Sequence, residues 1–173
     1  MIGACPGAIG EVKLVYYPLT NSENKTETEW VAVDNDKNFT TQWKLENLTA
    51  DTKYVVQIEA RLDEKSKVSD NIEGAFRTPP TETGEDDIEF CVVTCHDYIR
   101  KDTTDGHKIY SAMMDLFPDF YVHTGDIEYY DKPDPWAMTE ELMRFKWDRL
   151  FAMPLQRNFW SQVTTYYMKD DHD

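Results

Sequence analysis

The sequence predicts a small antiparallel β-sandwich followed by an α/β segment, and a change of rhythm along the chain supports this fold class. Residues 1–80 alternate apolar and polar side chains with a period of two, which is typical of strands that bury one face. Residues 88–173 combine short apolar runs with helically spaced apolar residues, the pattern of a parallel sheet with crossover helices. The polar, acidic stretch 81–87 between them is predicted to be a linker.

Composition narrows the possible functions. The chain has 173 residues, of which 40% are hydrophobic and 13% aromatic, enough for one medium or two small packed domains. The formal net charge of −15 argues against a nucleic-acid partner, because phosphate backbones attract basic surfaces. The same charge is compatible with metal binding by carboxylates, although solubility alone also explains it.

Neither the cysteines nor the apolar runs of the sequence indicate an exported or membrane-anchored protein. Three cysteines, Cys5, Cys91 and Cys95, are an odd count that does not fit a disulfide scaffold. No apolar run approaches the roughly 20 residues that span a membrane. The first ten residues also lack the charged start and apolar core of a signal peptide.

In the first half, alternation predicts strands around residues 12–16, 30–33, 41–45 and 54–60. The segment 45–60 resembles the E–F corner of a fibronectin type III sandwich, with Leu48 before a polar turn and Tyr54 after it. In such a corner the tyrosine hydroxyl bonds back to the backbone. The stretch Phe76 to Pro80 resembles the exit strand of that fold. Since five or six strands are visible where about seven are needed, the first strand is expected to lie outside this chain.

In the second half, strands are predicted at residues 88–94, 120–122 and 164–168, with helices between them. The first helix covers residues 107–117, where apolar side chains recur at helical spacing. The second follows Thr139, a plausible N-cap with two glutamates in the first turn, and runs to Pro154.

Each of these three strands ends in potential metal ligands. The endings are residues 95–98 (CHDY), 123–126 (HTGD) and 170–173 (DDHD). The carboxyl ends of parallel strands meet at one edge of a sheet, so a thiol, carboxylates and imidazoles would converge there. One such ending could be a simple turn or helix cap, but three in succession favour a functional site over three independent turns.

The motifs resemble those of metallophosphoesterases, which carry a first ligand motif, then GDxx(D/N/Y), then GNH(D/E), each at a strand end. Residues 123–130 (HTGDIEYY), followed by Asp131, are similar to the HxGDxxY signature of PhoD-like (alkaline phosphatase D) enzymes, and the resemblance covers nearly all of residues 8–173. It implies that residues 88–173 are the N-terminal half of an αββα metallophosphoesterase domain. It also implies a secreted hydrolase, periplasmic or extracellular, acting on phosphate mono- or diesters. The second sheet and the remaining ligands would lie beyond Asp173, so this chain alone is expected to be poorly active.

The residues themselves suggest the chemistry of the site. Gly125 lets the backbone approach closely, and the two oxygens of Asp126 can bridge two metal ions. Tyr129 can turn toward the same centre, where a phenolate favours Fe³⁺. The resemblance assigns Tyr129 and Cys95 to such an iron and puts Asp171 in the place of a metal-binding Asn. It also implies calcium, which prefers oxygen ligands, while another divalent metal is possible.

His172 falls where the family keeps an imidazole near the substrate phosphate. It is the predicted catalytic residue, stabilising developing charge or protonating the leaving oxygen. Four neighbours are predicted to stand behind the ligands or to have an uncertain role: Asp170, His123, Asp173 and His96. For His123, an ordinary core histidine is an even alternative.

Other noticeable residues have simpler interpretations. Cys91 is expected to be a buried structural thiol, His107 to lie at a solvated helix N-terminus, and Trp136, Trp147 and Trp160 to pack in the core or a lid. The glycosylation sequons at Asn24, Asn38 and Asn47 are interpreted as chance matches in polar turns.

Two alternatives to a PhoD-like enzyme stay open. One is a non-catalytic binding module with a degenerate phosphatase remnant. The other is a purple acid phosphatase, which shares GDxxY and an N-terminal sandwich but would carry Asp in place of Cys95 and Asn in place of Asp171.

Overall fold

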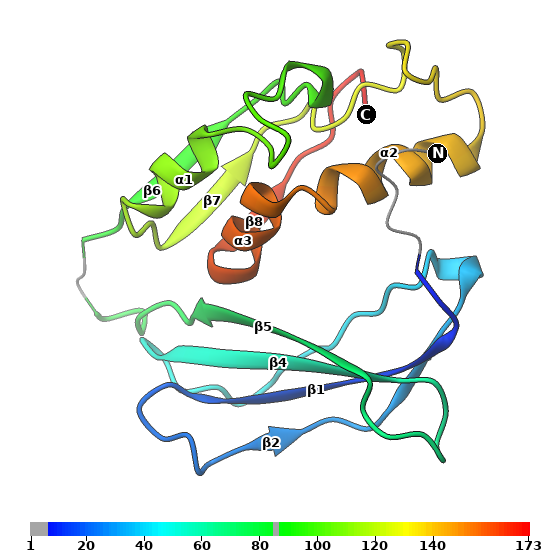
Figure 1. The fold of residues 1–173 in the computed structure, drawn as a ribbon. Coiled ribbons are helices and arrows are strands. Elements are labelled where there is room, and N and C mark those ends of the chain that lie inside the picture. The colour runs from blue at the N-terminus through cyan, green and yellow to red at the C-terminus, as the bar shows by residue number, and fades with distance from the viewer. Residues whose placement is uncertain (1–6, 85–86) are drawn as a thin grey trace. The chain divides into compact units, whose positions relative to one another are not determined.

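The computed structural model describes residues 7–84 and 87–173 (Figure 1). The chain divides into two compact units, whose described parts are these same two ranges. The division falls inside the stretch predicted to be a linker, of which residues 85 and 86 lie outside the described residues. No helix in the described ranges has the length and apolar character needed to cross a membrane.

The first unit is an antiparallel sheet in the order β2-β1-β4-β5, with β3 also paired to β1. Long strands β1 and β4 form its centre, and Leu14 of β1 lies opposite Ile58 of β4. Buried side chains from these strands and from β3 make a small core: Leu14, Val15, Val33, Tyr54 and Val55. The strands are β1 (Gly10–Pro18), β2 (Thr26–Glu27), β3 (Val31–Val33), β4 (Lys53–Arg61) and β5 (Asp70–Arg77).

Two expectations for this unit differ from the structure. Residues 41–45 form no strand, because alternating side chains indicate an extended chain but cannot supply the partner whose hydrogen bonds make a ladder. The exit strand begins at Asp70, ahead of the predicted Phe76, in a stretch where Asp70, Asn71 and Gly74 hide the alternation. All strands of the described residues in this unit belong to one sheet, so the two-sheet sandwich stays a prediction.

Tyr54 makes the hydrogen bond expected at the corner. The backbone N–H of Thr49 donates to Tyr54 Oη at 3.0 Å, and the tyrosine is only 5% exposed. Its ring stacks on Phe76 of β5 with centroids 5.5 Å apart. The hydroxyl therefore fixes the loop that enters β4 while the ring packs in the core.

Replacing Tyr54 with phenylalanine is expected to lower the free energy of unfolding by about 1–2 kcal/mol, because the Thr49 N–H loses its acceptor while the ring stays packed. Urea unfolding monitored by circular dichroism measures this. Tyr17→Phe, in the same sheet and with its ring against Lys25, is the control and should change stability by less than half as much. Equal effects of the two substitutions would contradict the role given to the Tyr54 hydroxyl.

The second unit contains the predicted parallel sheet, and its strand order is β6-β7-β8. The predicted helices also form, and Thr139 Oγ1 accepts a hydrogen bond from the backbone N–H of Leu142 at 3.3 Å. A further helix, α3, begins at Pro154, where a missing N–H costs nothing in the first turn. The elements are β6 (Phe90–Val93), the 3-10 turn η2 (Tyr98–Arg100), α1 (Ile109–Met114), β7 (Phe120–His123), α2 (Glu140–Phe151), α3 (Pro154–Gln162) and β8 (Thr164–Tyr167).

The two faces of the parallel sheet differ. One face packs on α1 and α3 through a buried cluster of Tyr110, Met113, Tyr121, Phe159 and Val163. The alternate residues Phe90, Val92 and Tyr166 are 55%, 54% and 58% exposed. Parallel sheets normally have both faces covered, so the exposure of these apolar side chains is unusual for such a sheet.

Candidate metal centre

The loops that follow β6, β7 and β8 are joined through their main chains. The N–H of Cys95 donates to the carbonyl oxygen of Gly125 at 3.2 Å, and the N–H of His96 donates to that of Asp126 at 2.7 Å. On the other side, the N–H of Tyr130 donates to the carbonyl oxygen of His172 at 3.1 Å. The three predicted strand ends therefore form one continuous rim.

Asp126 lies at the middle of this rim. The thiol of Cys95 and the hydroxyl of Tyr129 both reach Asp126 Oδ2, at 3.4 and 3.3 Å. The other oxygen, Oδ1, is buried and has no hydrogen-bond partner within the described part of the chain. Burying a carboxylate oxygen that accepts no hydrogen bond costs free energy. The carboxylate of Asp126, with the thiol and hydroxyl beside it, therefore fits a bound cation better than a metal-free core.

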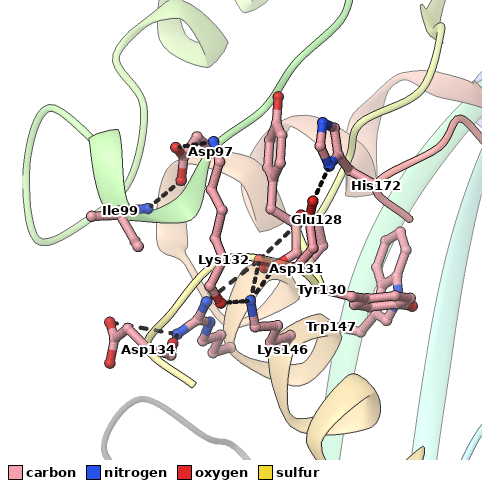
Figure 2. Close-up of polar contacts among 12 residues, drawn as sticks. Asp97, Ile99, Glu128, Tyr130, Asp131, Lys132, Asp134, Lys146, Trp147 and His172 are labelled. Atoms are coloured by element: carbon pink, nitrogen blue, oxygen red, sulfur yellow. Dashed lines mark hydrogen bonds and ion pairs between the residues drawn. The ribbon is translucent and has the colours of Figure 1, made fainter. Parts of the chain in front are cut away.

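Asp171 and His172 approach the same carboxylate from the end of β8. One ligand atom each from Asp126, Asp171 and His172 lies within 4.8 Å of the others. The Nδ1–H of His172 donates to Asp131 Oδ2 at 2.8 Å (Figure 2). The centroid of the His172 ring lies 4.7 Å from that of the Tyr129 ring. Partial desolvation opposes protonation, but the hydrogen bond and charge of Asp131 outweigh it and raise the pKa of His172.

The backbone around the centre is held in unusual conformations. Cys95 and Asp126 have φ values of 59° and 54°, in the left-handed region that residues with a side chain seldom occupy. Gly125 has φ 109°, and a Cβ there would lie 2.4 Å from Asp170 Cβ. The loop after β8 thus packs directly on the backbone beside Asp126, which only glycine permits.

Asp170 and Asp173 bond mainly to the backbone. Asp173 Oδ1 accepts from the N–H groups of Ile127 and Glu128 at 2.7 and 2.8 Å, which ties the end of the β8 loop to the β7 loop. Asp170 Oδ1 accepts from the N–H of Asp171 at 2.9 Å. These contacts shape the loop that presents Asp171 and His172.

Gln156 of α3, which no sequence motif indicates, contacts two histidines on the buried side of the rim. His96 Nε2 lies 2.8 Å from His107 Nδ1, and Gln156 Nε2 of α3 lies 3.1 and 2.8 Å from these two atoms. The expectation of a solvated His107 is therefore wrong, since its ring is held against a buried neighbour. No sequence pattern around Gln156 indicates this role. Gly106 is the related feature, because its missing side chain leaves the space that the Gln156 amide occupies.

His123 is fully buried. Its Nδ1 accepts from the N–H of Gly125 at 3.3 Å, so it supports the loop that carries Asp126. Burial lowers the pKa of His123 to about 4, and the ring is neutral at pH 7.

Acid is expected to destabilise this unit through His96. Burial, with the nearby His107 and His123, lowers the pKa of His96 to about 3 against about 6.5 in an unfolded chain. Below that higher value the unfolded chain takes up a proton that the folded chain does not. The free energy of unfolding should then fall by up to about 1.4 kcal/mol per pH unit as pH drops from about 6.5 towards 3.

Urea unfolding between about pH 7 and about pH 4 tests this dependence. His96→Gln keeps a hydrogen-bonding side chain but cannot titrate, so its stability should decline less steeply with acid. Parallel declines in the two proteins would contradict a neutral, buried His96.

A cavity of about 240 Å³ adjoins the centre, lined among others by Cys95, His96, Tyr129 and Lys132. Lys132 Nζ pairs with Asp97 Oδ2 at 2.9 Å (Figure 2). The same Nζ lies 3.5 Å from the centroid of the Tyr129 ring. The motif patterns did not indicate Lys132, because it reaches Asp97 across 35 residues of sequence.

The remaining predicted residues lie away from the rim. Cys91 is a free thiol that packs against the buried cluster beside α1, where burial raises its pKa. Cys5 lies outside the described residues. Trp147 and Trp160 pack on the core around Leu150, whereas Trp136 is 54% exposed. Among the sequons, Asn24 and Asn47 are exposed and Asn38 is half-buried.

Comparison with known proteins supports the fold. A solved structure described as "Structure of PhoD" is similar to this chain with a TM-score of 0.73 and 14% sequence identity. The likeness covers 96% of this chain and 33% of the other, so the chain spans about a third of that protein's length. The resemblance to PhoD indicated by the motifs is thereby confirmed at the level of the fold. No family model and no curated protein sequence matches the chain.

Proposed function

We propose that residues 88–173 form the front half of a metal-dependent hydrolase of phosphate mono- or diesters, of the PhoD-like type. The observation that carries this proposal is the convergence of a thiol, a phenol and an imidazole on Asp126, whose buried Oδ1 has no donor among the described residues. The shared fold with PhoD supports it. Residues 1–80 would be the fibronectin type III-like domain of the same exported protein.

Cys95, Asp126, Tyr129 and Asp171 are the residues that would hold the metal ions. A thiolate and a phenolate suit Fe³⁺, while the carboxylates of Asp126 and Asp171 suit Ca²⁺ or another divalent ion. Such ions would supply Lewis-acid stabilisation to the charge that develops on a phosphoryl group.

The chain's own residues would orient and protonate the substrate. Asp131 holds the His172 ring through Nδ1, which leaves Nε2 to donate a proton to the leaving oxygen. Lys132, beside the cavity, would attract the substrate's negative charge. Because His172 also lies within the ligand cluster, metal coordination is the competing role for its ring.

The test is metal analysis combined with hydrolysis assays on the longest natural chain that contains these residues. Iron with calcium, and chelator-sensitive hydrolysis of a chromogenic phosphate monoester or diester, would support the proposal. Iron with zinc would favour a purple acid phosphatase. A purified protein without bound metal and without hydrolysis would favour a binding module and overturn the proposal.

A further inference from the structure

One buried lysine of α2 reaches the loop that carries the proposed ligands. Lys146 is 1% exposed, and its Nζ donates to the carbonyl oxygens of Tyr129 and, at 3.2 Å, Lys132. The same ammonium lies 3.8 Å from Glu128 Oε1 (Figure 2). A lysine is seldom buried this deeply unless its three donors are used, so these contacts account for its position.

Lys146 binds the turn formed by residues 129–132, and this turn contacts the residues that follow all three strands. Tyr129 reaches Asp126 after β7, at 3.3 Å. Asp131 binds His172 after β8, at 2.8 Å, and Lys132 pairs with Asp97 after β6, at 2.9 Å. The main chain adds the hydrogen bond from Tyr130 to His172. A shift of this short turn would therefore move a ligand, the partner of the proposed acid and the cation beside the cavity together.

We propose that Lys146 is a positioning residue for this centre. Its ammonium group binds the carbonyl oxygens at both ends of turn 129–132 and thereby fixes the orientation of the Tyr129, Asp131 and Lys132 side chains. The inference rests on the proposed function in so far as the centre binds metal. It assigns Lys146 no contact with metal or substrate. Its effect passes through two backbone carbonyls.

Arg149 provides a matched comparison on the same helix, one turn further on. It is 3% exposed and lies 3.4 Å from the same Glu128 oxygen. It also contacts the carbonyl oxygen and the carboxylate of Asp134, the latter at 3.8 Å, and the rings of Tyr98 and Phe145, at 4.0 and 5.5 Å. Replacing it removes a buried cation and destabilises the unit without releasing either carbonyl of the turn.

The experiment compares Lys146→Met and Arg149→Met with the wild type in the longest natural chain that contains these residues. Fe³⁺ titration gives the affinity, and the phenolate-to-iron absorption band reports the geometry of Tyr129. Lys146→Met should weaken iron binding about tenfold or more and shift or weaken the band, as loss of residues supporting a ligand commonly does. Arg149→Met should lower thermal stability yet leave the affinity within about twofold and the band unchanged.

A second variant, Lys146→Gln, keeps one amide donor for the turn and should fall between wild type and Lys146→Met; it serves alone if the methionine variant does not fold. Wild-type affinity and absorption in the Lys146 variants would overturn the inference while leaving the proposed function intact. So would losses in Arg149→Met as large as those in Lys146→Met, because the role would then be general stability. A wild-type chain that binds no iron would overturn the proposed metal centre, and the inference with it.

Discussion

In the longest natural chain that contains these residues, replacing Asp126 with alanine is expected to lower phosphate-ester hydrolysis by about three orders of magnitude. The Cys95 thiol and the Tyr129 hydroxyl both reach this carboxylate, and it has an oxygen within 4.8 Å of potential ligand atoms of Asp171 and His172. Without it the remaining ligands lose their common partner. Losing about 4 kcal/mol of transition-state stabilisation corresponds to this factor, since each 1.36 kcal/mol changes a rate tenfold.

In the metal-free protein, the same substitution should change the stability of the fold very little. Alanine removes two weak hydrogen bonds but also a buried oxygen that has no donor among the described residues, so the free energy of unfolding should change by less than about 1 kcal/mol. Steady-state kinetics with a phosphate monoester and a diester, alongside urea unfolding, separates the two effects. Asp115→Ala, at the exposed end of α1, is the control and should retain full activity. A near-normal rate for Asp126→Ala would refute the proposed centre.

Replacing Gly125 with alanine should damage both folding and the site. A side chain at φ 109° is strained, and its Cβ would overlap Asp170 Cβ at 2.4 Å, which forces the loop after β8 outward. We expect the free energy of unfolding to fall by about 3 kcal/mol or more, and metal affinity to fall with it because Asp171 and His172 move.

Gly84→Ala is the matched control for this prediction. Its nearest contacts, Pro80 Cβ and the carbonyl oxygen of Thr81, lie at 3.2 Å, and its φ is not in the left-handed range. Thermal unfolding and metal titration of both variants provide the measurement. If Gly125→Ala were no less stable than Gly84→Ala, the close packing of Asp170 on Gly125 would have to be wrong.

Local signals explain why so much of the second unit could be predicted. Phe90–Val93 and Phe120–His123 are apolar strands followed at once by potential ligands, so short stretches of sequence indicate both the sheet and the edge that carries the candidate site. Thr139 likewise marks the start of α2. Cys95, Asp126 and Asp171 are far apart along the chain, but they could still be assigned to one site because parallel topology brings their strand ends together.

Long-range contacts explain what the sequence left undetermined. Lys146 and Gln156 are ordinary polar residues of helices, and their roles depend on carbonyls or histidines supplied by loops many residues away. Residues 41–45 show the converse, where a correct local pattern of alternation lacks a pairing partner. Periodicity describes which way side chains point, but pairing and burial are decided by the rest of the chain.

The bonds that join the three strand ends have a thermodynamic consequence. Because Cys95, Asp126 and Asp171 come together only when β6, β7 and β8 are paired, an ion that binds them binds the native state and hardly the unfolded chain. By mass action, a cation at a hundred times its dissociation constant would add about 2.7 kcal/mol to stability. Melting temperatures in a panel of cations can therefore rank the metals that suit this centre before any substrate has been identified.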